Sequence, residues 1–458
     1  MAQKTVESLP TELLMKIFKL TRPSREEAIH LGKISVDHGA WGIARVCGRW
    51  RATVLDMPCM WTDMVISIPV GTASWVNYPV TLVKEHIARG GDDPMRVTLL
   101  SEEVPGYTTA KLFAALAYSS RRWETLELAA KWPLPTEALM RMRDNIPLLR
   151  EIHICADSES GFVGGHVFEI APSLQIVRIT EPRLHADNRN MNWRSPDYNS
   201  DYNDSFMWPR DPPFEPIFPW AQLTHYESQC MDPFHFTALF LAANLTVCQA
   251  TVIPEARHHA WRAPAHLVRF EHLQKLTLFA PAPLLDALVL PALQDLFIEV
   301  FPRDFPHVVD LLRRSKCSLR KFWIKSHPPV QQYRAVLETN AHIEELGIIG
   351  RESLRHIFGA DANVDSIIRA LGAVPTLVPN LQAFYIHDQS ADLDMDAVVD
   401  MVEGRMPTLE RLCITECEAR VFPRKARARI TKLQERGLEV QFKREHERWA
   451  ARGLLEYV

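Results

Sequence analysis

Four acidic residues near the end of the chain have a spacing that could bind calcium. Asp392, Asp394, Asp396 and Glu403 match positions 1, 3, 5 and 12 of a twelve-residue calcium-binding loop. Such a loop needs glycine at position 6 for its sharp turn, and Ala397 stands there instead. Because apolar residues at helical spacing follow, we expect a helix whose acidic first turn suits its dipole. Calcium binding is the alternative.

No other set of residues has the spacing of a catalytic or metal site. His446 and Glu447 begin a zinc-helix pattern, but position 450 is alanine where a second histidine is needed. Residues 161–166, GFVGGH, lack the Gly-Lys-Ser/Thr end of a phosphate-binding loop, and His258-His259 is an isolated pair. The sequence has no Gly-x-Ser-x-Gly motif and no Cys-x-x-Cys pair among its eight cysteines. We therefore expect no metal, no cofactor and no enzymatic activity.

Length and composition allow a large core and give no sign of a nucleic-acid or membrane partner. The chain has 458 residues, 47% of them hydrophobic, and its net charge is only −4, so bulk attraction to polyanions is not expected. Residues 234–254 contain no Lys, Arg, Asp or Glu, but His235, Asn244 and Gln249 argue against a membrane span. We expect a buried helix at 236–243 and a strand at 245–253 instead. The cysteine pattern favours a reducing compartment, the cytoplasm or the nucleus.

A short apolar motif that recurs along most of the chain predicts the fold. It has apolar residues at its first, fourth and sixth positions, and most copies lie about 20 to 29 residues apart, as in a solenoid repeat. The alternation at its end is typical of a short strand with one buried face. The copies begin at Trp123, Leu149, Leu174, Leu273, Leu293, Leu319, Ile343, Leu381 and Leu409, with weaker copies at Leu223 and Leu245.

Helices are expected between these strands, at residues 109–119, 305–314, 330–339 and 391–403. A strand and a helix in alternation cannot bury their apolar faces alone, so neighbouring units must stack into a parallel ladder. The predicted fold class is α/β: a leucine-rich-repeat-like solenoid of short parallel strands and helices over residues 63–458, preceded by a small all-α module over residues 1–62. Two or three separate α/β domains are the alternative, which the unbroken recurrence of the motif disfavours.

Two stretches interrupt the repeat. Residues 181–220 are rich in Pro, Asn, Asp and aromatic residues, and loops of this length are usually functional or disordered. A protein substrate could bind the aromatic side chains there, or the stretch could be a simple surface insert. The candidate substrate-binding residues are Trp193, Tyr198, Tyr202 and Trp208. Residues 350–379 form a second, shorter interruption.

The C-terminal end is predicted to close the repeat array. We interpret the basic stretch 420–436 as the solvated face of a helix, with a nuclear import signal or a nucleic-acid patch as the alternative. A last strand is expected at 438–442. Residues 443–458 are then predicted to form a capping helix that covers the open end.

The first 62 residues predict a small helical module. Residues 9–20, LPTELLMKIFKL, carry a wide apolar stripe, but three charged residues interrupt it, which excludes a signal peptide. Residues 41–61 contain a second amphipathic helix that Pro58 ends. Its apolar face comprises Ile43, Val46, Cys47, Trp50 and Val54. A domain of about 55 residues buries too little surface to be very stable alone, so we expect a partner to cover the first stripe.

These two helices together resemble an F-box. The pattern reads Leu9-Pro10-x-Glu12-Leu13-Leu14-x-x-Ile17-Phe18, then Val46-Cys47-x-x-Trp50 and Trp61, with a longer middle segment, near 21–40, than an F-box usually has. The resemblance implies docking onto a Skp-type adaptor, which hangs from the cullin scaffold of a ubiquitin ligase. It implies that the adaptor contacts Leu9, Pro10, Leu13, Leu14, Ile17 and Phe18, with support from Val46, Trp50 and Val54. Each of these could instead pack inside the module, the favoured interpretation for Trp50.

The repeats resemble leucine-rich repeats, although the Asn or Cys that usually follows the strand is matched clearly only at Cys417. Together the two resemblances imply a substrate-recognition subunit of an SCF-type cullin-RING ubiquitin ligase. The module would bind the adaptor and the repeats a protein substrate, while other subunits transfer ubiquitin. One alternative is a leucine-rich scaffold unconnected with ubiquitin, whose helical start only caps the array. A calcium-regulated binding protein is the other.

Overall fold

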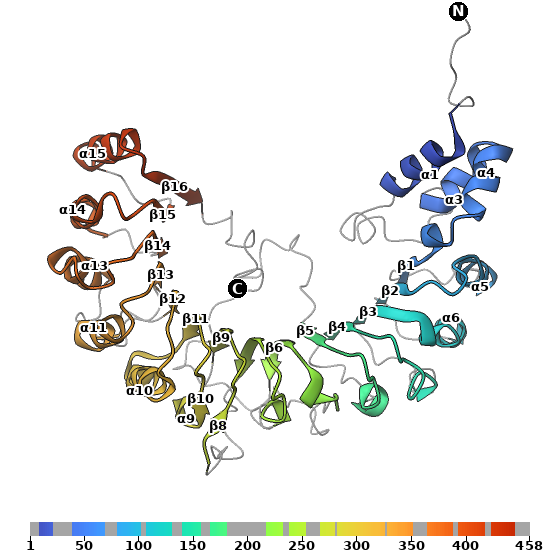
Figure 1. Cartoon of the computed structure of the whole chain (residues 1–458), viewed down its shortest axis with the longest axis horizontal. Helices are drawn as coiled ribbons and strands as arrows, with labels where there is room; N and C mark the ends of the chain where they lie inside the picture. The colour runs from blue at the N-terminus through green and yellow to red at the C-terminus, as the bar shows by residue number, and fades with distance from the viewer. Residues whose placement is uncertain are drawn as a thin grey trace, which may run out of the picture. The chain divides into compact units, whose positions relative to one another are not determined.

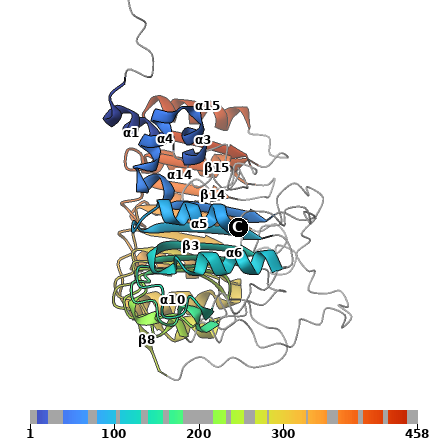
Figure 2. The ribbon, with the colours of Figure 1, turned by 90° about the vertical axis from the view of Figure 1, so that its right-hand side faces the viewer.

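The computed structural model describes residues 9–21, 39–68, 80–101, 107–130, 140–156, 165–180, 217–231, 238–252, 266–279, 282–325, 328–350, 364–387, 393–416 and 423–444. The chain divides into two compact units, residues 1–223 (unit 1) and residues 224–458 (unit 2). Each unit is α/β, with parallel strands that pair in sequence order and helices that connect them (Figures 1 and 2). This order is compatible with the predicted solenoid. The predicted boundary at residue 62 lies inside unit 1 and stays a prediction.

Unit 1 begins with helices and continues as a parallel ladder in the order β1-β2-β3-β4-β5. Its helices are α1 (Thr11–Leu20), α3 (Gly39–Val46), α4 (Gly48–Leu55), α5 (Val80–Arg89) and α6 (Tyr107–Ala117). Its strands are β1 (Asp63–Ile68), β2 (Met95–Ser101), β3 (Trp123–Ala130), β4 (Glu151–Ala156) and β5 (Ile176–Thr180). Short 3-10 helices lie at Pro58–Trp61, Ser120–Arg122, Gly165–Phe168 and Trp220–Gln222.

Unit 2 is a longer ladder in the order β6-β7-β9-β11-β12-β13-β14-β15-β16, with a separate parallel pair of β8 and β10. Its strands are β6 (His225–Met231), β7 (Val247–Val252), β8 (Val268–Arg269), β9 (Lys275–Phe279), β10 (Leu288–Val289), β11 (Asp295–Glu299), β12 (Lys321–Lys325), β13 (Glu345–Ile349), β14 (Ala383–His387), β15 (Arg411–Glu416) and β16 (Glu439–Arg444). Its helices are α9 (Ala282–Asp286), α10 (Phe305–Ser315), α11 (Val330–Thr339), α13 (Val364–Ala373), α14 (Met395–Arg405) and α15 (Arg424–Glu435), with a 3-10 helix at Pro302–Asp304.

The recurring motif occupies equivalent places in successive strands, which confirms the predicted strands and their buried positions. From β9 to β15 the register is constant, so the fourth motif residues form one row and the sixth a second. The rows are Leu276, Leu296, Phe322, Leu346, Phe384 and Leu412, then Leu278, Ile298, Ile324, Ile348, Ile386 and Ile414, all at most 3% exposed. The Phe322 ring lies 6.0 Å from the Tyr333 ring of α11, so these rows face the helices. Burying each such side chain contributes about 1.5–3 kcal/mol to folding.

The helices predicted between strands are confirmed as α6, α10, α11 and α14, and the basic stretch forms α15. Helix α14 begins four residues later than predicted because the Asp394 side chain accepts a hydrogen bond from the Ala397 amide and so caps its first turn.

Other elements differ from the prediction. The stretch 350–379 contains helix α13, so it holds a regular repeat element rather than only an interruption. Residues 443–444 belong to strand β16, not to a capping helix, and 445–458 lie outside the described residues. Of the predicted insert, residues 181–216 also lie outside them, whereas Phe218 and Trp220 are buried in unit 1.

Candidate functional site

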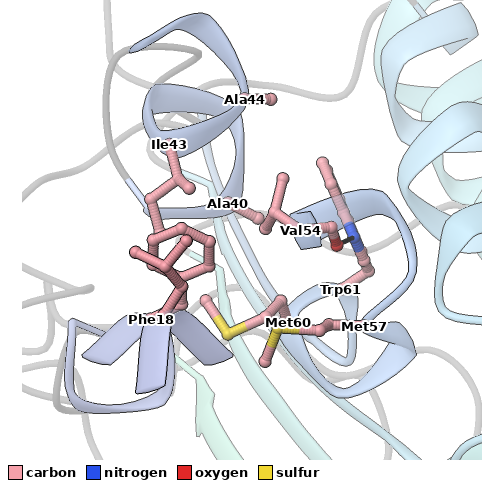
Figure 3. Packing of buried hydrophobic residues seen from close by; sticks show 9 residues of the cluster. Phe18, Ala40, Ile43, Ala44, Val54, Met57, Met60 and Trp61 are labelled. Carbon is pink, nitrogen blue, oxygen red and sulfur yellow. Dashed lines mark hydrogen bonds between the residues drawn. The ribbon is translucent and has the colours of Figure 1, made fainter. Parts of the chain in front are cut away.

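The first helices of unit 1 form a small apolar core of their own (Figure 3). The rings of Phe18 and Trp50 lie 5.1 Å apart, so α1 packs on α4. The indole nitrogen of Trp61 donates a hydrogen bond to the Val54 carbonyl at 3.0 Å, which ties the 3-10 helix to α4. The buried members of this core are Leu14, Phe18, Ala40, Ile43, Ala44, Val54, Met57, Met60 and Trp61.

Helix α1 begins at Thr11, with Pro10 as its N-terminal cap rather than its first helical residue. Pro10 still fits, because its fixed φ of −55° leads into the helix and it lacks an N–H that would need a partner. Glu12 lies in the first turn and Lys19 in the last, and both charges complement the helix dipole.

The second predicted helix is broken in two. Cys47 is extended, with φ −158° and ψ 168°, and its sulfur accepts a hydrogen bond from the Trp50 amide at 3.4 Å, so that it caps α4. Gly48 follows and disfavours a continuous helix. The single apolar face predicted for residues 41–61 is therefore wrong. The break leaves Val46 59% exposed at the end of α3.

One face of α1 exposes apolar side chains to solvent. Leu13 is 44%, Ile17 is 42% and Leu20 is 86% exposed. These residues are spaced by four and three, so they lie along one side of the helix, whereas Leu14 and Phe18 point into the core. We call Leu13, Ile17 and Leu20 the α1 stripe. An apolar row on a well-packed helix is typical of a surface that another protein covers.

The α1 stripe belongs to a wider concentration of apolar surface. Among the described residues, twelve large apolar side chains are exposed, and five of them lie in α1, α3 and α4. These five are Leu13, Ile17, Leu20, Val46 and Leu55. The helical module therefore exposes more of these large apolar side chains than its share of the described residues accounts for.

The predicted adaptor-facing residues divide into three groups. Leu13, Ile17, Val46 and Pro10 are exposed, so a partner can reach them. Leu9 and Trp50 are half-buried against the module core. The remaining three, Leu14, Phe18 and Val54, are at most 1% exposed and build the core. This burial agrees with a supporting role for Val54, while adaptor contact by Leu14 and Phe18 stays a prediction.

The sequence-based site left out Leu20 and Leu55. The spacing of Leu20 from Leu13, seven residues, placed both on one helix face and could have identified it. The predicted substrate-binding residues Trp193, Tyr198, Tyr202 and Trp208 lie outside the described residues.

Aromatic and charged side chains connect the module to the first repeat. The Arg89 guanidinium of α5 lies over two indole rings, 4.2 Å from the centroid of Trp41 and 4.8 Å from that of Trp61. The His86 ring meets Trp61 edge-on at 5.4 Å, and its Nε2 lies 3.2 Å from the Asp63 carbonyl. Burial lowers the pKa of His86 to about 4, so its ring is neutral at physiological pH.

The acidic residues with calcium-like spacing are engaged otherwise. Arg369 binds the Asp394 carboxylate at 2.8 Å and holds its pKa below the usual range. Arg429 of α15 lies 2.6 Å from Asp400 and 2.7 Å from Glu403, and Glu403 also has a lowered pKa because of it. Asp392 lies outside the described residues, among which no group of three metal-ligating side chains converges.

Comparison with known proteins adds no identity. No protein-family model matches the chain, and neither does any curated protein. Among the helices that the structure describes, none combines the length and the apolar character that a membrane span requires.

Proposed function

We propose that the chain is the substrate-recognition subunit of an SCF-type cullin-RING ubiquitin ligase. Its N-terminal helices act as an F-box that docks onto a Skp-type adaptor, and its repeats, as a leucine-rich-repeat-like solenoid, hold a protein substrate. The chain works in the cytoplasm or the nucleus, and transfer of ubiquitin belongs to other subunits.

The α1 stripe is the observation that carries this proposal. A helix that only capped the repeat ladder would direct Leu13 and Ile17 inward, toward the repeats. Both side chains are instead more than 40% exposed, while Leu14 and Phe18 of the same helix supply its packing. A helix held in place by one face and apolar on another is suited to binding a second protein.

The motif residues and the ladder support the same interpretation. Of the motif residues, Phe18 lies in one small core, and Leu9 and Trp50 pack against it. The ladder that follows presents strands in sequence order, an architecture that offers extended protein-binding surfaces. A leucine-rich scaffold unconnected with ubiquitin is the alternative, because the ladder alone does not require the adaptor.

Binding of the full chain to a purified Skp-type adaptor tests the proposal. We would compare wild type with the variant Leu13→Asp, Ile17→Asp, which places two charges in the α1 stripe. The matched control is Leu241→Asp, which changes a 64% exposed leucine of unit 2 in the same way. Two charged residues at the centre of an interface should weaken binding by about 100-fold or more, while the control binds like wild type.

The melting temperature of each variant has to match that of wild type, because only a folded variant reports on the surface. A wild-type chain that does not bind the adaptor would contradict the ligase proposal and favour the scaffold. Equal binding by wild type and the α1 variant would show that the adaptor uses another surface, and the argument from the α1 stripe would fail.

A further inference from the structure

The face of the unit 2 ladder opposite its helices carries an unexpected apolar cluster. Between the two buried rows, the register aligns Phe297, Trp323, Gly347, Tyr385 and Cys413 across β11 to β15. Side chains alternate along a strand, and Phe322 faces α11, so Trp323 and its row point away from the helices. Figure 1 shows the described helices of unit 2 on one side of its strands.

These side chains are nevertheless buried. Phe297 is 5%, Trp323 is 4%, Tyr385 is 2% and Cys413 is 0% exposed, and they form a cluster separate from the helix-facing core. Within unit 2, no described helix lies over this face (Figure 1). An apolar cluster on an uncovered sheet face would remain in contact with water, so its burial calls for an occupant.

The polar groups of the cluster are already bonded within the ladder. The Trp323 indole donates a hydrogen bond to Glu345 at 3.2 Å, and Arg411 donates one to the Tyr385 hydroxyl at 3.4 Å. The flanking charges also pair with each other, Lys321 with Glu345 at 3.2 Å and Arg411 with Glu439 at 3.0 Å. An occupant of this face therefore meets aromatic ring faces and needs apolar side chains of its own.

We infer that this row is a docking site for the chain's own C-terminal segment, residues 445–458. The segment continues directly from β16, the neighbour of the strand that carries Cys413. Its fourteen residues span up to roughly 46 Å when extended at about 3.3 Å each. The five strand steps from β16 back to β11 need only about 24 Å at about 4.8 Å each.

Composition favours this segment over the other undescribed stretches that follow these strands. The apolar residues of the C-terminal segment are Trp449, Leu454, Leu455, Tyr457 and Val458. Residues 388–392, DQSAD, contain no large apolar side chain, and residues 417–422 contain only Val421 and Phe422. Residues 351–363 are the strongest competitor, with Ile357 and Phe358 among their apolar residues.

The reactivity of the Cys413 thiol tests the docking site in the full chain. The Cys413 side chain is fully buried, so N-ethylmaleimide should label its sulfur only when its cover opens. In the variant Leu454→Asp, Leu455→Asp, labelling of the Cys413 peptide, measured by mass spectrometry, should become about tenfold faster or more. The matched control, Ile357→Asp, Phe358→Asp, should label like wild type.

A chain that ends at Arg444 provides a second measurement. Its Cys413 should label as fast as in the substituted variant, and an excess of a synthetic peptide of residues 445–458 should restore protection, whereas a scrambled peptide should not. Any of three results would overturn the inference. Cys413 could stay protected without the segment, it could become exposed only in the variant with substitutions in 351–363, or the peptide could fail to protect it. None of these readouts depends on the ligase adaptor, so they stand or fall separately from the proposed function.

Discussion

The contact between Gly347 and Trp323 allows a quantitative test of the aromatic row. In strand β13, Gly347 is the register partner of Trp323 in β12, and the indole ring occupies the space where a side chain at position 347 would begin. A Cβ atom added at Gly347 would lie 2.2 Å from Cε3 and 2.3 Å from Cδ2 of that ring. No side chain tolerates such distances, so Gly347→Ala forces the ring to leave its place or the two strands to separate.

The cost follows from what the ring loses. Overpacking of a well-filled site costs about 1–3 kcal/mol, and complete displacement of a buried tryptophan approaches the cost of Trp323→Ala, about 3–5 kcal/mol. We expect Gly347→Ala to destabilise unit 2 by about 2 kcal/mol. Once Trp323 is alanine the clash is absent, so the double variant should be as stable as Trp323→Ala alone. The cycle then gives a coupling energy of about 1–3 kcal/mol.

Urea and thermal unfolding of the full chain and of the three variants provide the assay. The control is Gly404→Ala in α14, where an added Cβ has no neighbour within 4 Å, and where alanine should stabilise by up to about 1 kcal/mol. Two results would refute the reasoning: an unchanged midpoint for Gly347→Ala, or additive effects of the two substitutions. Either would mean that the indole does not rest on the backbone of β13.

Two further predictions concern buried charged or titratable groups. Arg405 donates hydrogen bonds to the carbonyls of Leu371, Leu377 and Val378, at 2.9, 2.7 and 3.0 Å. Arg405→Ala leaves these carbonyl groups unpaired and should lower the free energy of unfolding in urea by about 3 kcal/mol. Arg405→Lys lacks the planar guanidinium and should not restore this stability. Full stability of the lysine variant would contradict the role of Arg405 as a donor to three carbonyls. Folding lowers the pKa of His86 from 6.5 to about 4, so unfolding takes up a proton at pH values between these two. The contribution of this histidine to stability is therefore fully present above pH 6.5 and is lost as the pH falls toward 4. His86→Gln should flatten the dependence of the unfolding free energy on pH in this window by about 1.4 kcal/mol per pH unit, measured by urea unfolding at a series of pH values, and an unchanged slope would argue against a neutral buried ring.

The repeat could be predicted from sequence because its signal is local. The motif residues Leu319, Phe322 and Ile324 stand at the first, fourth and sixth of six positions, and each lies in the core at 0% exposure. Helix α11 has the predicted bounds, Val330–Thr339, because Pro329 precedes it and the helical pattern stops at its end. Such features depend on a few neighbouring residues, so no knowledge of distant contacts was needed.

The missing features depend on tertiary contacts. Helical periodicity runs through Cys47, and the break there rests on an extended backbone and on a thiol cap that composition does not indicate. In α1, both Leu13 and Leu14 belong to a wide apolar stripe, and only packing against Trp50 and its neighbours decides which one is buried. Trp323 lies between motif positions, so its row becomes visible only when the strand register is known.

The strand face that points away from the helices differs between unit 1 and unit 2. On the corresponding face of unit 1, Thr98, Glu127 and His153 form a polar row. The Thr98 hydroxyl donates a hydrogen bond to the Glu127 carboxylate at 3.2 Å, and Nδ1 of His153 lies 3.4 Å from the other oxygen of that carboxylate. Parallel strands with this register therefore do not require aromatic side chains on the helix-free face. The Trp323–Tyr385 pair, 4.5 Å between ring centroids, is an addition to the fold rather than a condition for it. Under the proposed function, a substrate that binds this face of unit 2 has to displace the C-terminal segment, so variants that release the segment should bind such a substrate more tightly.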